Sequence, residues 1–182
     1  MLVVTPNTCI DVTTWLPTLA PGSVSRATRT EVTPGGKGVN VCRTLRALGA
    51  TPRLIGLAPL SDPRLEALLA AEGCDFVPVP HHGRTRLALI LLEGDGRVTV
   101  VNGRGPEPSE WDPAELLRTV ADEVDRTAPA AVLCSGSLPP DVPGEGTSDD
   151  ALAEAPDRVR EHRGRVTREL RDYLELGLDD LL

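Results

Sequence analysis

The run Gly35-Gly36-Lys37-Gly38-Val39-Asn40 is the first group of residues whose types and spacing could do chemistry. Consecutive glycines let the backbone approach a ligand closely, and a helix that starts there offers free N–H groups and a partial positive charge. Such a turn suits hydroxyl groups or an anion. It is not a Walker loop, because Lys37 is followed by Gly38 and not by Ser or Thr. A plain glycine-rich turn into a helix remains the alternative interpretation.

Three charged residues stand where a ligand could meet them. Asp11 follows the first apolar run, at the expected mouth of a parallel sheet, where a carboxylate could accept bonds from two hydroxyls. Arg86 opens one predicted hairpin and Arg26 lies on an earlier one, and a guanidinium in such a place suits a phosphate. The simpler interpretations are a turn or cap role for Asp11 and solvated strand edges for the arginines.

Hydroxyl and backbone donors are also expected at Ser135-Gly136-Ser137, which follows an apolar strand. This is not a nucleophile elbow, because the sequence has no Gly-x-Ser-x-Gly. No catalytic triad is indicated either. The only histidines, His81, His82 and His162, are predicted to lie on the surface.

The elements that must position these residues follow from hydrophobic pattern and turn signals. Strands alternating with helices predict an α/β fold built on a parallel sheet. Two hairpin regions, 10–32 and 85–102, interrupt that alternation and are predicted to form a small β layer above the sheet. In the helix predicted over 40–48, Val41, Leu45 and Leu48 share one face. Further strands are expected at 2–5, 54–57, 76–79 and 130–134, and further helices after Asp62 and from Asp112 to Asp125.

Composition excludes several classes of partner. The net charge is −8 and aromatic residues make up 2% of the 182 residues, so a nucleic-acid partner is not expected. No apolar run reaches the roughly 20 residues of a membrane span, and a soluble, cytoplasmic protein is expected. The four cysteines are scattered, which favours reduced, packed thiols, with a disulfide or a metal site as the alternative.

Taken in order, five motifs resemble the PfkB (ribokinase-like) carbohydrate kinases, and in particular the 1-phosphofructokinase and tagatose-6-phosphate kinase branch. The resemblance covers residues 1–143 and implies a partial ribokinase-like parallel-sheet core with a small β lid. It implies ATP and Mg²⁺ as cofactors, a sugar phosphate (fructose 1-phosphate or tagatose 6-phosphate) as substrate, and a homodimer formed through the lid. The motifs are Asn7 to Asp11, Gly35 to Asn40, Gly83 to Arg86, Asn102 to Pro106, and Ser135 to Pro140.

The resemblance also implies a substrate site. Sugar hydroxyls would be bound by Asp11, Gly36 and Asn40, with Lys37 beside them. The substrate phosphate would be held by Arg86 and Arg26, with Ser137 near it.

One part of the family pattern is absent from the sequence. The family's catalytic Asp stands in a Gly-Ala-Gly-Asp motif, and no such run occurs here. The expectation is a chain truncated before the catalytic Asp and the ATP site, and inactive alone, with an acidic linker at 144–150 and a helical tail of unknown role at 151–182. A non-catalytic module that binds sugar phosphate or dimerises, and a decayed or frameshifted gene product, are the alternatives.

Overall fold

Four short strands form a parallel sheet in the computed structural model, which describes residues 1–140. Their order is β5-β4-β1-β8, and every neighbouring pair is parallel. The predicted linker and tail, with His162, lie outside the described residues. All four strands were expected from the sequence, and their observed bounds are Leu2–Thr5 (β1), Arg53–Pro59 (β4), Asp75–His81 (β5) and Val132–Cys134 (β8).

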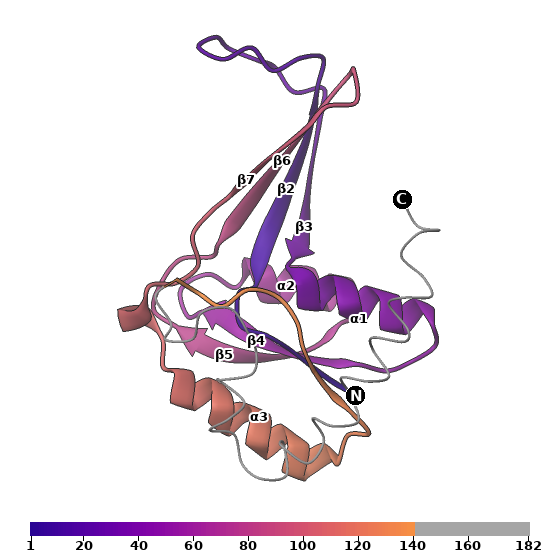
Figure 1. Ribbon diagram of the computed structural model, residues 1–182, viewed down its shortest axis with the longest axis vertical. Helices are drawn as coiled ribbons and strands as arrows, with labels where there is room; N and C mark the ends of the chain where they lie inside the picture. Colours follow the sequence, from indigo (N-terminus) through magenta and orange to yellow (C-terminus); the bar gives the residue numbers. More distant parts are fainter. Residues whose placement is uncertain (141–182) are drawn as a thin grey trace.

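Helices cover both faces of this sheet (Figure 1). The helices α1 (Lys37–Ala47) and α2 (Arg64–Ala71) pack on one face, over a cluster that includes Val3 and Leu54. Helix α3 (Pro113–Thr127) packs on the other face. It begins as its sequence predicts, with a proline in the first turn and a capping aspartate before it.

Helix α1 begins three residues before its predicted start. On the predicted face, Val41 and Leu45 are partly buried against the core. The buried residues are Gly38, Val39 and Cys42, because the first turn lies directly against β1. Leu48 caps the helix and is 56% exposed, so it does not share the packing of Val41 and Leu45.

The two predicted hairpins form a single second sheet, which rises from the edge of the first (Figure 1). Its order is β3-β2-β6-β7, and each hairpin is antiparallel. A parallel pairing of β2 with β6 joins the two hairpins, with Ile10 opposite Leu87. The strands are Cys9–Leu16 (β2), Arg29–Gly35 (β3), Leu87–Glu93 (β6) and Val98–Asn102 (β7).

The buried carboxylate of Glu93 links the two hairpins at the far end of the second sheet. Glu93 accepts hydrogen bonds from the Leu19 N–H (2.6 Å), the Thr18 hydroxyl (3.2 Å) and the Arg97 guanidinium (3.0 Å). It therefore ties the loop after β2 to the hairpin of β6 and β7. The first hairpin and the second are held together at this end as well as along the parallel strand pair.

The four cysteines are free thiols, of which Cys9 and Cys42 are buried. Within residues 1–140, no helix has the length and apolar character needed to cross a membrane.

Candidate functional site

The predicted site residues lie where the base of the second sheet meets the carboxyl-terminal edge of the first. Backbone hydrogen bonds join the segments there: Ile10 N–H donates to the Arg86 carbonyl (2.9 Å), and Ser135 N–H donates to the Val4 carbonyl (2.9 Å). The turn after β1, the first turn of α1, both ends of the second hairpin and the loop after β8 thus converge on one place.

Asp11 lies on β2 and is half-buried. Its carboxylate contacts the Cys9 thiol on one side and lies against Gly35 on the other. The Cys9 thiol donates to Oδ1 (3.2 Å). Burial, and then the charge of Asp11, raise the pKa of Cys9 to about 12, so the thiol stays protonated and remains a donor. On the neighbouring strand, a Cβ on Gly35 would lie 2.1 Å from Oδ1. Glycine at this position therefore makes the space that the carboxylate occupies.

The first turn of α1 carries Gly36, Lys37 and Asn40. Gly36 has a φ of 109°, which favours glycine, and a Cβ added to it would lie 3.6 Å from the Asn7 carbonyl oxygen. Lys37 and Asn40 are exposed. The N-terminus of this helix thus combines a backbone that a ligand can approach closely with an ammonium group and a side-chain amide.

Arg43, which the sequence analysis missed, orients Asn40. Its Nη1 donates to Asn40 Oδ1 (2.8 Å), while Nε and Nη2 hold the Glu72 carboxylate (2.9 and 2.6 Å). Nη2 also donates to the carbonyl of Pro34 (2.8 Å). Because Oδ1 of Asn40 is occupied, its Nδ2 donors are left for a ligand. The three-residue spacing of Asn40 and Arg43 on a helix could have indicated this contact.

The Arg86 guanidinium is held by three neutral oxygens. It donates to the Gly103 carbonyl (2.9 Å), the Asn7 carbonyl (3.2 Å) and the Asn102 side-chain oxygen (3.4 Å). Among residues 1–140, no carboxylate forms an ion pair with it. A fixed, uncompensated guanidinium is suited to binding an anion.

Ser137 is exposed and, like Arg86, has Asn7 as a hydrogen-bond partner. Asn7, which is buried, donates from Nδ2 to Ser137 Oγ (3.0 Å) and to the Leu138 carbonyl (3.4 Å). Gly136 brings this loop against Lys37, because a Cβ on Gly136 would lie 3.8 Å from the Cβ of Lys37. The loop after β8 therefore borders both the start of α1 and the turn that supports Arg86.

Arg26 is not brought to this place. Strand β3 begins at Arg29, so Arg26 lies in the exposed loop at the far end of the second sheet. Its predicted part in phosphate binding stays a prediction.

His81 is buried, so its predicted surface position is wrong. Its Nδ1 accepts the Gly83 N–H (3.1 Å), and burial lowers its pKa, which keeps the ring neutral and able to accept. The reason is the loop after β5: the His82 N–H donates to the Glu110 carbonyl (2.8 Å) and turns the preceding side chain inward.

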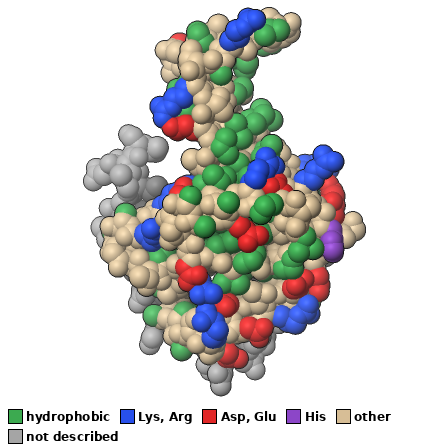
Figure 2. Space-filling model, turned by 180° about the vertical axis from the view of Figure 1, so that it is seen from behind, with side chains coloured by type: hydrophobic (Ala, Val, Ile, Leu, Met, Phe, Trp, Pro, Cys, Tyr) green, Lys and Arg blue, Asp and Glu red, His purple; other side chains and the backbone are tan. Residues whose placement is uncertain are grey.

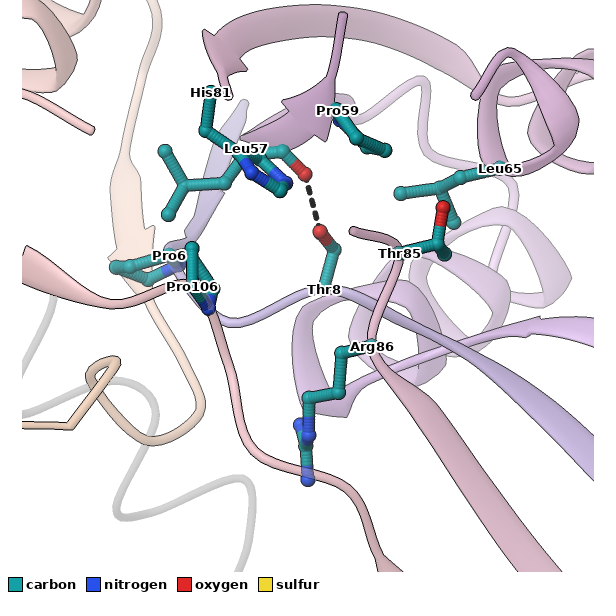
Figure 3. Close-up of a pocket in the computed structure, with 9 residues that line it drawn as sticks. All are labelled: Pro6, Thr8, Leu57, Pro59, Leu65, His81, Thr85, Arg86 and Pro106. Atoms are coloured by element: carbon teal, nitrogen blue, oxygen red, sulfur yellow. Dashed lines mark hydrogen bonds between the residues drawn. The ribbon is translucent and has the colours of Figure 1, made fainter. Parts of the chain in front are cut away.

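His81 faces a narrow pocket beneath the site, in which the Thr8 hydroxyl donates to the Leu57 carbonyl (Figure 3). Arg86 lines the same pocket and extends away from that hydrogen bond (Figure 3). The pocket has no room for a water molecule.

Known proteins resemble this chain over most of its length. It is 36% identical to a 1-phosphofructokinase of Haloferax volcanii over 162 residues, which cover 86% of this chain and 50% of that protein. It is 31% identical to a 1-phosphofructokinase of Escherichia coli K12, over 80% of this chain and 46% of the relative. The chain thus spans about half the length of these curated relatives.

Solved structures share the fold. A possible 1-phosphofructokinase from Thermotoga maritima has a TM-score of 0.72 at 25% identity, over 88% of this chain and 50% of that one. Phosphofructokinase-2 from Escherichia coli, in complex with substrates and products, also has a TM-score of 0.72, at 24% identity over 89% of this chain and 51% of that one. Residues 2–170 match the pfkB family of carbohydrate kinases. The chain belongs to that family.

Proposed function

We propose that this chain binds a sugar phosphate, fructose 1-phosphate or tagatose 6-phosphate, as the acceptor side of an ATP-dependent sugar-phosphate kinase of the cytoplasm. The observation that carries the proposal is the Arg86 guanidinium, which is fixed by three neutral oxygens. One of them is the carbonyl of Asn7, whose side chain donates to the exposed Ser137. The identity to 1-phosphofructokinases supports the substrate class.

The two ends of the sugar phosphate would meet different groups. Asp11 accepts from sugar hydroxyls and Asn40 donates to them, while Gly36 lets the backbone come close. Arg86 and Ser137 bind the phosphate, with Lys37 between the two sets. The second sheet then acts as a lid, and its closure would exclude water that competes with the sugar for the phosphoryl group.

The family implies ATP with a divalent metal ion. Among residues 1–140, no three His, Cys, Asp or Glu side chains are grouped so that they could hold a metal. We assign the described residues to the sugar side of the reaction.

A second candidate function is binding of the sugar phosphate without phosphoryl transfer. It is favoured by one observation, namely that no Gly-Ala-Gly-Asp run occurs in the sequence. The two functions share the same sugar site and differ in turnover alone.

Calorimetry and a kinase assay on the purified chain test both functions. Fructose 1-phosphate or tagatose 6-phosphate is expected to bind, and fructose to bind far more weakly, because it lacks the phosphate that Arg86 holds. ADP release from ATP and Mg²⁺ with the bound sugar would establish the kinase. Binding without ADP release would establish the non-catalytic module, and an absence of binding by both sugar phosphates would refute the site.

We further propose that the second sheet forms a homodimer through one of its faces. The strand register places a row of four apolar residues across the whole sheet, and paired residues share a face. Figure 2 shows hydrophobic side chains gathered where this sheet rises from the core. Three members of the row are exposed and Val12 is partly buried against the core. Exposed apolar residues gathered in this way are typical of a protein interface. The row is Val32, Val12, Leu89 and Val101.

Two neighbouring residues on β7 allow a matched test of the dimer. Val101 and Val100 are 51% and 52% exposed but lie on opposite faces of the sheet. We expect Val101→Lys to shift the chain from dimer to monomer in sedimentation velocity, because it buries a charge in the interface. Val100→Lys should leave the dimer intact. A monomeric native chain, or equal dissociation by both variants, would contradict the assignment.

A further inference from the structure

Asn7 occupies the turn between β1 and β2 and is 9% exposed. Its side-chain amide joins this turn to the loop after β8. Nδ2 donates to Ser137 Oγ (3.0 Å) and to the Leu138 carbonyl (3.4 Å). A carbonyl can only accept, so the Leu138 contact fixes which end of the amide is nitrogen.

This orientation of the Asn7 amide leaves its oxygen without a hydrogen bond from any residue that the structure describes. Asn7 Oδ1 is buried and has no hydrogen-bond partner among the described residues. It faces Gly105, where a Cβ would lie 2.6 Å away. An unsatisfied buried acceptor is destabilising, so the arrangement is not explained by folding stability alone.

The amide determines what the Ser137 hydroxyl can do. A hydroxyl has one proton and two lone pairs. Because one lone pair of Ser137 Oγ accepts from Asn7 Nδ2, its proton is directed elsewhere, and Ser137 is exposed. The hydroxyl proton is therefore available for donation to a ligand on the exposed side, which is the role that an anionic ligand requires.

The same residue also holds the cation. The backbone carbonyl of Asn7 accepts from Arg86 Nη1 (3.2 Å). One buried residue thus contacts two groups that can donate to an anion, Ser137 through its side chain and Arg86 through its backbone.

We propose that Asn7 is a positioning residue that directs the Ser137 hydroxyl and the Arg86 guanidinium toward one phosphate. The inference rests on the proposed function, because the phosphate is that of the bound sugar. Asn7 does not itself touch the ligand.

A double-mutant cycle with fructose 1-phosphate tests the coupling. Asn7→Ala and Ser137→Ala are each expected to raise the Kd about tenfold, the effect of one hydrogen bond to a charged group. Together they should raise it by little more than either alone, because Asn7 acts through Ser137. Additive effects, or an unchanged Kd in Asn7→Ala, would overturn the proposal.

A measurement without ligand keeps the inference separate from the proposed function. The sequence contains three asparagines and no glutamine, so three side-chain amides give NH₂ signals in an NMR spectrum of the whole chain, and they are Asn7, Asn40 and Asn102. In Ser137→Ala, the Asn7 amide should shift and exchange faster with water, while the Asn40 amide keeps its position. Ser61→Ala removes an exposed hydroxyl elsewhere in the chain and is the control, so it should shift none of the three amide signals.

The outcomes are distinguishable. A native chain that binds no sugar phosphate, with the Asn7 amide responding to Ser137→Ala, would refute the proposed function and support the hydrogen bond that orients Ser137. An Asn7 amide that is indifferent to Ser137→Ala would overturn the inference whatever the chain binds. This second arm leaves Asn7 in place, so it holds even if Asn7→Ala fails to fold.

Discussion

Replacing Arg86 with methionine is expected to raise the Kd for fructose 1-phosphate at least about 100-fold, which corresponds to about 2.7 kcal/mol. Methionine keeps the length of the side-chain stem but removes the charge and every donor. Hydrogen bonds to a charged phosphate contribute about 1.5–3 kcal/mol each, so the loss of two is enough for this effect. Isothermal titration calorimetry measures the change directly.

Two further arginine variants distinguish a specific contact between Arg86 and the phosphate from a general effect of positive charge. Arg84→Met removes the same charge from an exposed residue of the same loop and should change the Kd less than threefold at 0.15 M salt, where distant charges are screened. Arg86→Lys should fall between, because lysine keeps the charge but lacks the planar fork that reaches three oxygens at once. Equal losses in Arg84→Met and Arg86→Met would show that Arg86 has no specific contact with the phosphate.

Local patterns in the sequence predicted most elements and the position of most candidate site residues. Turn signals and strand–helix alternation depend on neighbours in the chain, and the helix α3 begins where Asp112 and Pro113 indicate. The glycine run from Gly35 similarly marked both a helix start and a place of close approach. These features needed no knowledge of distant contacts.

Contacts between distant segments were not predictable in the same way. The parallel pairing of β2 with β6 joins strands separated by several other elements, and hairpin signals alone leave the two hairpins independent. Arg43 reaches Glu72, 29 positions away, and thereby fixes Asn40. The burial of His81 depends on the Glu110 backbone, which no local pattern reveals.

The largest stability effect is expected from Gly38→Ala, although alanine is the better helix former. Within an ordinary helix this exchange stabilises by about 1 kcal/mol. Here the new Cβ would lie 2.4 Å from the Cβ of Thr5, where carbon atoms normally approach to about 3.5–4.0 Å. A Cβ is fixed by its backbone, so no side-chain rotation relieves the contact. Overpacking of this kind costs about 3 kcal/mol, and the net free energy of unfolding should fall by about 2 kcal/mol.

A second substitution in Thr5 tests whether the contact itself is the cause. The three atoms nearest the added Cβ all belong to the Thr5 side chain, so Thr5→Gly removes every one of them. Thr5→Gly alone should destabilise the chain, because it opens a cavity in a fully buried strand. In the double variant, Gly38→Ala should cost nothing or stabilise, which urea unfolding of the four chains would show as a coupling of about 2–3 kcal/mol. Equal costs of Gly38→Ala with and without Thr5 would contradict the steric explanation and would place the requirement for glycine elsewhere in the first turn of α1.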